Sequence, residues 1–451
     1  MALFPNTYAP RNPLTRGSLW FSYAAHIASY VPTACSILPR IQYALPMDRQ
    51  EANDELTEGY QPSLGIVFPV LPPALDGIGD HTAHLARHLA ECTTVRVFTA
   101  SPDAAPIAAV DVVQDAFTLP PARGIRALHY AVLNAPPDWL LIQFNQFSYG
   151  RWGLNPFLPY TLHRIMQALP DLKVAVLFHE DFVPVNSWRN AIMSTWQRSQ
   201  FWALGSMADL VLFSIDPWVD EYRSWFPDTP VRHLPVGSNM PHLDRSKDTI
   251  RKTLGISEKT TVLGYFGTVH GSRRVSLFNS AVRAARRAAA ELKVLYVGTD
   301  GTALRAHLPD DVAFHDAGPL PAEEVSKHLT AMDILAAPIV DGVSTRRGAF
   351  LAGLQHGIAS VSTKGTQTDA LLCEADGDAF LLADEDDPAG FARCVQELVH
   401  SPTQRQAMGQ SGQALYTCRF SWPVIAQRLL GYMHEVDHPV SQVMASVTEA
   451  A

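Results

Sequence analysis

The segment ILAAPIVDGVSTRRGAFLAGLQHGIASVST, residues 334–363, predicts the fold of the chain. It divides into an apolar run, a polar loop, a helix-forming stretch and a second apolar run, at residues 334–340, 341–348, 349–356 and 358–362. Gly357 is the expected helix stop, and both apolar runs have the length of strands. Two strands joined by a helix form a βαβ unit, so the segment predicts a parallel sheet and an α/β fold.

The loop of this unit is a candidate site for an anion. In a parallel sheet, the loop after a strand opens at the edge where ligands bind, and the next helix presents free N–H groups and the positive end of its dipole. Arg346 and Arg347 lie on this loop. Guanidinium groups beside oriented amides suit a bound diphosphate. The alternative is an ordinary surface loop whose two arginines are solvated.

The composition predicts a globular protein of two domains. The 451 residues are 47% hydrophobic and 18% charged, which is enough apolar material for large cores and excludes a disordered polymer. The net charge of -9 argues against a protein that binds nucleic acid mainly through electrostatics. The five cysteines have no paired spacing, so they indicate neither a zinc site nor a disulfide framework and favour a reducing compartment.

The residues before Met47 differ from the rest, because they contain arginines but no acid. Residues 18–39 carry no charge, yet prolines and polar residues make them a poor transmembrane helix, and they begin too late for a signal peptide. A third interpretation is that translation begins at Met47. We expect this leader to be disordered or untranslated, and residues 440–451 to be a frayed tail.

The first half opens with a strand, a glycine-containing loop and a helix, at residues 64–70, 71–80 and 81–91. This order is typical of a nucleotide-binding α/β domain, with Asp80 as the expected helix cap. Gly77 and Gly79 would let the backbone approach a ligand closely. The G-x-G pattern lacks a third glycine, so it is a weak dinucleotide motif, and a pair of turn glycines is the alternative.

Further strands alternate with helices, which predicts a parallel sheet covered on both faces. The expected strands are residues 95–99, 139–144, 173–178 and 209–214, and the expected helices include residues 156–169 and 189–207. His179, Glu180 and Asp181 directly follow one of these strands, and polar groups at the carboxyl end of a buried strand are candidate site residues. For His179, the alternative is a ring satisfied by local backbone.

Three histidines, His81, His84 and His88, share one face of the predicted helix because of their three- and four-residue spacing. A zinc site needs at least one more ligand, and the sequence offers neither an HExxH motif nor a cysteine partner. We therefore expect a plain helix face, no metal site and no cofactor.

A second α/β series follows residues 226–241, which are rich in proline and glycine and mark a domain boundary. Its first ligand-side loop carries Arg273 and Arg274, and Gly298 follows its second strand. The expected parts are a leader, a first domain, a second domain, a C-terminal helix and a tail, at residues 1–60, 61–236, 237–420, 421–438 and 439–451.

Three stretches together resemble the retaining glycosyltransferases of family four, which have the GT-B fold of two facing Rossmann-like domains with parallel sheets. They are PPALDGIGDHTAHLARHL, GYFGTVHGSRR and AMDILAAPIVDGVSTRRGAFLAGLQHGIASVST, and the resemblance covers about residues 64–435. It implies a nucleotide diphosphate sugar held in the cleft, mainly by the second domain, with the acceptor on the first. It also implies that no metal is needed, since protein groups neutralise the leaving diphosphate.

The resemblance also assigns roles by position. Gly77 and Gly79 would approach the diphosphate from the first domain, and His179 would contact the transferred sugar. Arg273 or Arg274 would take the place of the family's basic residue on the phosphates. The expected catalytic residues are His179, Asp341, Arg346 and Arg347, and the expected donor-binding residues are Gly77, Gly79, Arg273, Arg274, Gly298, Gly342 and Ser344.

The sequence departs from the family at its pair of glutamates, E-x7-E. Alignment through Gly357 places Ser344 and Ala352 where the two glutamates belong, with Asp341 near the first. The ribose-binding carboxylate is therefore missing, and DGVSTRRG adds two positive charges in place of EGFG. We interpret this as a divergent branch that holds the donor through arginines, while a subunit that has lost catalysis is the alternative.

The sequence thus predicts a glycosyltransferase that moves a sugar from a nucleotide diphosphate sugar, with retention and without a metal. The acceptor is unknown and could be a glycan, a lipid-linked molecule or a small molecule, and a place in polysaccharide biosynthesis follows from the resemblance alone. The alternatives are a sugar-nucleotide epimerase and a non-catalytic sugar-nucleotide-binding partner, whereas an NAD-dependent oxidoreductase lacks its motif. We expect a cytoplasmic protein without a nucleic-acid partner, and peripheral membrane contact stays open.

Overall fold

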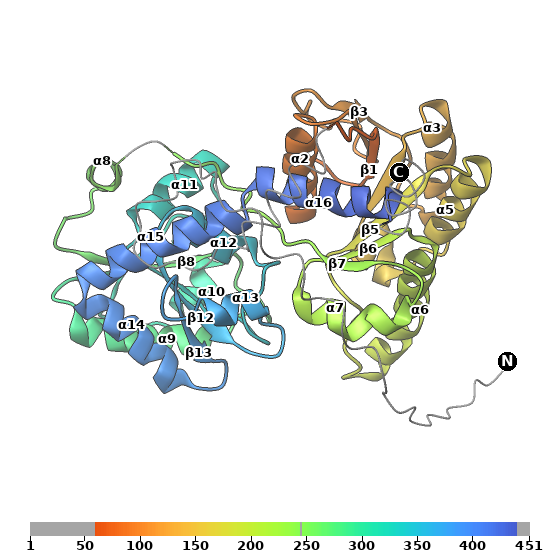
Figure 1. The fold of residues 1–451 in the computed structure, drawn as a ribbon. Coiled ribbons are helices and arrows are strands. Elements are labelled where there is room, and N and C mark those ends of the chain that lie inside the picture. The colour runs from red at the N-terminus through yellow and green to blue at the C-terminus, as the bar shows by residue number, and fades with distance from the viewer. Residues whose placement is uncertain (1–58, 244–245, 440–451) are drawn as a thin grey trace, which may run out of the picture. The chain divides into compact units, whose positions relative to one another are not determined.

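The structure is a computed structural model that describes residues 59–243 and 246–439, all within one compact unit, Tyr43–Ala451. The predicted leader up to residue 58, the proposed start at Met47 and the predicted tail from residue 440 lie outside the described residues. Two sheets of parallel strands, each covered by helices on both faces, organise the described chain (Figure 1). The predicted α/β architecture is confirmed.

The first sheet has seven strands in the order β3-β2-β1-β4-β5-β6-β7. Its central strands are continuous apolar runs because both of their faces are buried, as parallel sheets require. The strands are β1 (Leu64–Val67), β2 (Val95–Phe98), β3 (Asp111–Val113), β4 (Trp139–Phe144), β5 (Lys173–Phe178), β6 (Leu210–Phe213) and β7 (Val231–His233). The last strand lies inside the stretch predicted as a linker, so that prediction is wrong there: Val231 is buried and pairs with Val211 of β6.

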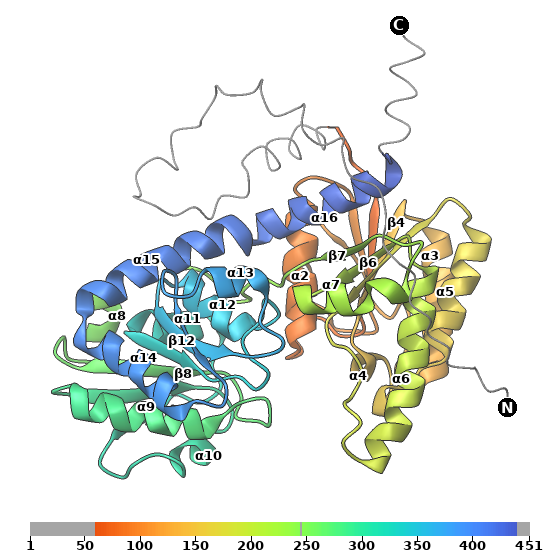
Figure 2. The same cartoon turned by 60° about the horizontal axis from the view of Figure 1, so that its bottom comes forward.

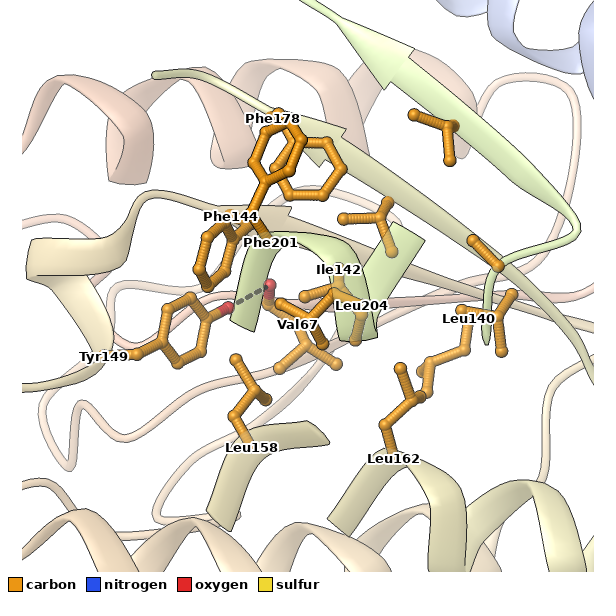
Figure 3. Close-up of a cluster of buried hydrophobic side chains, with 14 of the residues drawn as sticks. Val67, Leu140, Ile142, Phe144, Tyr149, Leu158, Leu162, Phe178, Phe201 and Leu204 are labelled. Carbon is orange, nitrogen blue, oxygen red and sulfur yellow. Dashed lines mark hydrogen bonds between the residues drawn. The ribbon is translucent and has the colours of Figure 1, made fainter. Parts of the chain in front are cut away.

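Helices of the first domain divide between the two faces of this sheet. Side chains of α3, α5, α6 and α7 pack on one face, in the core that Figure 3 shows around Phe178, Phe201 and Leu162. The other face is covered by α2 and by α16, which returns from the end of the chain to lie beside α2 (Figures 1 and 2). The helical elements are α2 (Gly77–Leu89), η1 (Ala122–Ala127), α3 (Leu128–Asn134), α4 (Gln146–Tyr149), η2 (Arg151–Gly153), α5 (Phe157–Ala168), α6 (Trp188–Met207), α7 (Asp216–Tyr222), η3 (Arg223–Trp225) and α16 (Trp422–Asp437).

The second sheet has six strands in the order β10-β9-β8-β11-β12-β13. The strands are β8 (Thr261–Phe266), β9 (Leu292–Val297), β10 (Ala313–Asp316), β11 (Ile334–Ala337), β12 (Ala359–Lys364) and β13 (Leu381–Asp384). Side chains of α9, α10 and α14 pack on one face, and those of α8, α11 and α12 pack on the other. The helices are α8 (Lys247–Thr253), α9 (Val275–Ala288), α10 (Gly301–Arg305), α11 (Ala322–Ala331), α12 (Gly348–Gln355), α13 (Ala370–Glu374), α14 (Pro388–His400) and α15 (Pro402–Arg419).

Each sheet reverses its strand order once, and this reversal locates a crevice. In the first sheet, β1 pairs with β2 on one side and with β4 on the other. In the second sheet, β8 pairs with β9 on one side and with β11 on the other. Ligands of open parallel sheets bind at the carboxyl ends of the strands next to such a switch point. The fold therefore predicts a ligand site among the loops that follow β1, β4, β8 and β11.

None of the helices in the described part of the chain is long and apolar enough to span a membrane.

Candidate functional site

A pocket of about 770 Å³ opens at the carboxyl edges of both sheets. Its lining comes from the loops that follow β1, β4, β5, β7 and β11 and from the end of β8, so it lies at both switch points. A neighbouring hollow of about 520 Å³ shares four lining residues with it: Phe147, Glu180, Arg346 and Arg347. The two hollows are large enough together for a ligand the size of a nucleotide sugar.

The N-terminus of α12 opens into this pocket. Its N-cap residue is Arg347, no side chain caps the helix, and its first turn contains no acid. Gly348 and Ala349 line the pocket together with Arg346 and Arg347. The first amides of a helix lack partners within the helix, and the dipole adds positive potential there, so this end of α12 is suited to an anion.

The two arginines of this loop are held in place, and the charges of Glu180 and Asp341 offset theirs only in part. The Arg346 guanidinium lies 4.7 Å from the ring centre of Trp218, and its NH2 group donates to Gln367 Oε1 at 2.6 Å. The Nε atoms of Arg346 and Arg347 are buried and have no hydrogen-bond partner within the described residues. Burial lowers the pKa of both, and for Arg347 the charges of Arg346 and Arg273 lower it further. A guanidinium stays charged at neutral pH, so an anion would relieve this repulsion.

The structure separates the two arginines of the other predicted basic loop. Arg273 is half-buried, its NH1 group has no partner among the described residues, and its charge acts on Arg347. Arg274 instead forms ion pairs with Glu385 at 3.0 Å and Asp386 at 3.1 Å. Arg273 therefore adds to the positive potential at the pocket, while the charge of Arg274 is already balanced.

The start of α2 differs from the prediction. The N-cap is Asp76 rather than Asp80, because the Asp76 carboxylate accepts hydrogen bonds from the amides of Ile78 at 2.9 Å and Gly79 at 2.8 Å. The two predicted glycines therefore lie in the first turn of the helix. Gly77 lines the pocket, whereas a Cβ at Gly79 would lie 2.5 Å from the carbonyl oxygen of Val70, which explains the glycine by packing.

His179 lines the pocket from the end of β5 and is 6% exposed. Its Nε2 lies 2.6 Å from Gln143 Oε1, and its ring meets that of His81 edge-on at 5.0 Å. Burial lowers the pKa of His179 to about 3, so the ring is neutral and Nε2–H donates to Gln143. The partner of the ring is thus a side chain of β4 and not the local backbone that the alternative interpretation invoked.

Four other predicted residues lie away from the main pocket. Asp341 is exposed, has a φ of 64°, and lines only the neighbouring hollow. Ser344 is fully buried, and its hydroxyl has no partner among the described residues. Gly342, with a φ of 88°, packs against the backbone of Gly365, and Gly298 packs against the carbonyl of Gly267. Tight backbone packing explains both glycines without a ligand.

A buried polar cluster behind the arginine loop was not predicted. His233 Nδ1 lies 2.8 Å from Asp216 Oδ1, and His233 Nε2 lies 2.9 Å from Thr345 Oγ1. Asp369 accepts from the amide of Thr345 at 2.6 Å and from the amide of Asp216 at 2.8 Å. The cluster therefore ties loops of the two sheets together directly before Arg346. His233 reaches this place at the end of β7, a strand that no pattern in the sequence predicted.

Within the described residues, Asp216, His233 and Asp369 also form the group whose ligand atoms lie close enough, within 4.8 Å of one another, for a metal ion. Their oxygen and nitrogen atoms already make the hydrogen bonds described above, and Asp216 Oδ2 accepts from the amide of Ala370 at 3.0 Å. A metal would have to replace these bonds, so the geometry fits a structural cluster better than a metal centre.

Comparison with known proteins identifies the second domain. Residues 260–401, which include β8, β11 and the arginine loop, match the family model described as glycosyl transferases group 1. This part of the chain is thus similar to a glycosyl transferases group 1 domain. The match covers the second sheet and its helices from α9 through α14, and it therefore includes Arg273, Arg346 and Arg347.

Two curated relatives are named as glycosyltransferases. The chain is 26% identical over 241 residues to the D-inositol 3-phosphate glycosyltransferase of Corynebacterium jeikeium, in an alignment that covers 49% of this chain and 56% of that protein. It is 25% identical over 244 residues, 50% of this chain and 62% of the relative, to the GDP-mannose-dependent monoacylated alpha-(1-6)-phosphatidylinositol monomannoside mannosyltransferase of Corynebacterium glutamicum. The chain thus matches somewhat over half the length of these relatives.

A solved structure supports the fold over most of the chain. Sucrose-phosphate synthase from Thermosynechococcus elongatus superposes with a TM-score of 0.63 at 15% identity, covering 87% of this chain and 100% of that one. Together with the two parallel sheets, this likeness confirms the predicted GT-B fold.

Proposed function

We propose that the protein is a glycosyltransferase that transfers a sugar from a nucleotide diphosphate sugar to an acceptor bound on the first domain. The observation that carries the proposal is the pair Arg346 and Arg347 at the N-terminus of α12, inside the region that matches the group 1 model: the Nε atom of each is buried without a hydrogen-bond partner among the described residues. The names of the curated relatives support the reaction class, and the mannosyltransferase among them is named as dependent on GDP-mannose.

The residues around the pocket suggest how this reaction would proceed. As the bond between the sugar and the diphosphate breaks, negative charge grows on the departing phosphate oxygens. Arg346 and Arg347, with the positive end of the α12 dipole, would stabilise that charge, and preorganised electrostatic groups of this kind supply a large part of many enzymes' rate enhancement. Arg273, whose charge acts on Arg347, would add to the positive potential at the pocket. We propose independence from a metal on the same basis, since the protein supplies the counter-charge itself, and we propose retention of configuration from the resemblance to the retaining family.

His179 would contact the transferred sugar from the first domain. Its ring is neutral and its Nε2–H is engaged by Gln143, so it is oriented as a fixed hydrogen-bonding group and not as a titrating acid. Glu180, the next residue, is exposed and lines both hollows. It offers a carboxylate beside the pocket, and Ser344, which aligns with a family glutamate, is buried and offers none.

The experiment is a donor screen with and without chelator. The protein is incubated with a panel of UDP- and GDP-sugars, and nucleotide diphosphate release is measured with and without EDTA, for the natural chain and for Arg346→Ala and Arg347→Ala. Arg287→Ala, which removes an exposed arginine of α9, is the matched control. Release that survives EDTA and falls only in the two loop variants supports the proposal. Interconversion of sugars without release would indicate an epimerase, and binding without turnover would indicate a non-catalytic partner.

A further inference from the structure

One side of the first domain exposes an unusual number of large apolar side chains. Of the eleven such side chains that the described residues expose, ten lie between residues 130 and 202. Trp188 and Tyr130 are both 70% exposed, and Trp152 is 60% exposed. Contiguous apolar surface on a folded domain usually marks a site of interaction, whereas isolated exposed side chains need no explanation.

These side chains belong to one layer of the structure. Helices α3, α5 and α6 cover the same face of the first sheet, so their outer surfaces face the same way (Figures 1 and 2). The short turn η2 is fastened to this layer, because the Trp196 indole N–H donates to the Trp152 carbonyl at 3.0 Å. We call this surface the aromatic face and define it by Trp152, Phe157, Tyr160, Trp188, Ile192 and Trp202.

The helical elements that bear this surface carry arginines but no acidic side chains. The helical elements η1, α3, α4, η2, α5 and α6 contain no aspartate or glutamate, although the whole chain carries a net charge of -9. They contain six exposed arginines, at positions 123, 126, 151, 164, 189 and 198. Arg151 and Arg189 lie over the rings of Trp152 and Trp188, at 4.8 and 5.3 Å from the ring centres. Aromatic rings and arginines therefore alternate along helical elements that contain no acid, while α7, on the same face of the sheet, carries Asp220 and Glu221.

The same surface contains a small hollow that suits a phosphate. It has a volume of about 90 Å³ and is lined by Arg126, Arg164, Tyr160 and Thr161 among others. Thr161 is 1% exposed, and its hydroxyl has no hydrogen-bond partner among the described residues. Two cationic groups and a free buried hydroxyl are the groups that a phosphate ester would engage.

We propose that the aromatic face docks the first domain on an anionic lipid surface. Tryptophan and tyrosine prefer the boundary between lipid headgroups and acyl chains, and arginines close to anionic headgroups add electrostatic attraction. A protein partner would be expected to bring complementary acids, but it would not explain why the arginines are spread over four helical elements with aromatic rings between them. The charge and the composition therefore favour a membrane.

Docking through this face would also bear on the proposed function, and this one step rests on that proposal. Phe147 of α4, which is 49% exposed, lines the main pocket, and Arg198 of α6 lines the neighbouring hollow. A bilayer against the aromatic face would therefore lie close to the mouth of the pocket, and an acceptor anchored in lipid could reach it from the first domain.

The test is sedimentation of the full chain with phosphatidylcholine vesicles, with and without phosphatidylglycerol. We expect binding that requires phosphatidylglycerol and weakens with salt. The double variants Trp188→Ser/Trp202→Ser and Arg164→Gln/Arg189→Gln should each weaken it roughly tenfold or more. Arg283→Gln/Arg287→Gln, on the basic helix α9 without exposed aromatic residues, is the control and should bind like the natural chain.

The controls separate docking from folding and from the proposed function. All variants should keep their melting temperature and their affinity for a nucleoside diphosphate, because none lies in the pocket. Absence of binding to phosphatidylglycerol vesicles, equal binding to both vesicle types, or an equal loss in the α9 control would overturn the proposal. Self-association that the tryptophan variant abolishes, without vesicle binding, would overturn it in favour of a second copy of the chain.

Discussion

Two helices begin at the pocket, and their first turns are electrostatically opposite. At α2, the carboxylate of Asp76 already accepts from two of the amides of the first turn. At α12, the N-cap residue is Arg347, and no side chain occupies the amides. A helix N-terminus attracts an anion only where no acidic group already occupies its amides and offsets its positive potential. We therefore expect the anion site at α12 of the second domain and not at α2 of the first. The resemblance had implied that Gly77 and Gly79 also approach the diphosphate from the first domain.

The largest effect is expected from making α12 resemble α2. Arg347→Asp places a carboxylate at the N-cap of α12, where it would accept from the amides that the diphosphate needs. The loss of one charge-assisted contact together with added repulsion amounts to about 3–4 kcal/mol, or roughly a hundred- to thousandfold in affinity for a nucleoside diphosphate. Calorimetric titration measures this, and the melting temperature should stay the same or rise. Unchanged affinity would mean that the anion does not bind at α12.

The second effect concerns the first domain, which should contribute to turnover but not to nucleotide binding. His179→Ala should lower turnover roughly tenfold or more while the affinity for the nucleoside diphosphate stays constant. Because burial lowers the pKa of His179 to about 3, the ratio of the two rates should not change between pH 5.5 and 8. His84→Ala, at a ring stacked on Trp422 outside the pocket, is the matched control. Collapse of the fold in the His179 variant would favour a structural role.

The third effect is a pH dependence of stability that Asp181 causes. Burial raises the pKa of Asp181 to about 6, although the charge of Arg346 and the Tyr222 hydroxyl oppose the rise. The unfolded chain therefore loses this proton at lower pH than the folded one. The stabilisation from Asp181 is complete below about pH 4 and is lost as pH rises through about 6. Asp181→Asn should remove this step and raise the unfolding free energy above pH 6 by about 1–2 kcal/mol. An equal dependence in both proteins, measured by urea unfolding, would contradict the assignment.

The smallest effect is expected at Asp76, the N-cap residue of α2. Asp76→Asn keeps an oxygen that caps the helix and removes the charge, so the affinity for the nucleoside diphosphate should rise about two- to fivefold with little change in stability. Asp76→Ala should instead cost about 1 kcal/mol of unfolding free energy through loss of the cap. A large loss of affinity in the asparagine variant would show that α2 contributes to the anion site after all.

Much of the fold could be predicted from the sequence because its main strands are buried on both faces. The apolar runs at β4, β5 and β8 have the same bounds in sequence and structure. Three short strands, β3, β7 and β13, were missed. The first two have only three residues each, and all three lie at sheet edges, where partial exposure removes the apolar run that marks a strand.

The site was predictable where local chemistry decides it, and not where distant partners do. Arg346 and Arg347 line the pocket because a βαβ loop must open there. Arg273 and Arg274 cannot be told apart from sequence, because Glu385 and Asp386, which neutralise Arg274, come from a later loop. The start of α2 was misplaced because two aspartates flank the glycines and only packing on Val70 selects the first. The catalytic and binding roles themselves remain predictions.

The central claim is that the arginine loop and the N-terminus of α12 hold the diphosphate. The most direct measurement compares a nucleoside diphosphate with its monophosphate, by calorimetric titration of the natural chain and of Arg347→Ala. One charge-assisted contact is worth about 1.5–3 kcal/mol, so the variant should bind the diphosphate roughly ten- to a hundredfold more weakly and the monophosphate far less so. Arg347→Lys should recover only part of the loss, since an ammonium cannot grip two oxygens in a planar fork. An equal loss for both nucleotides, or no loss for either, would contradict the account.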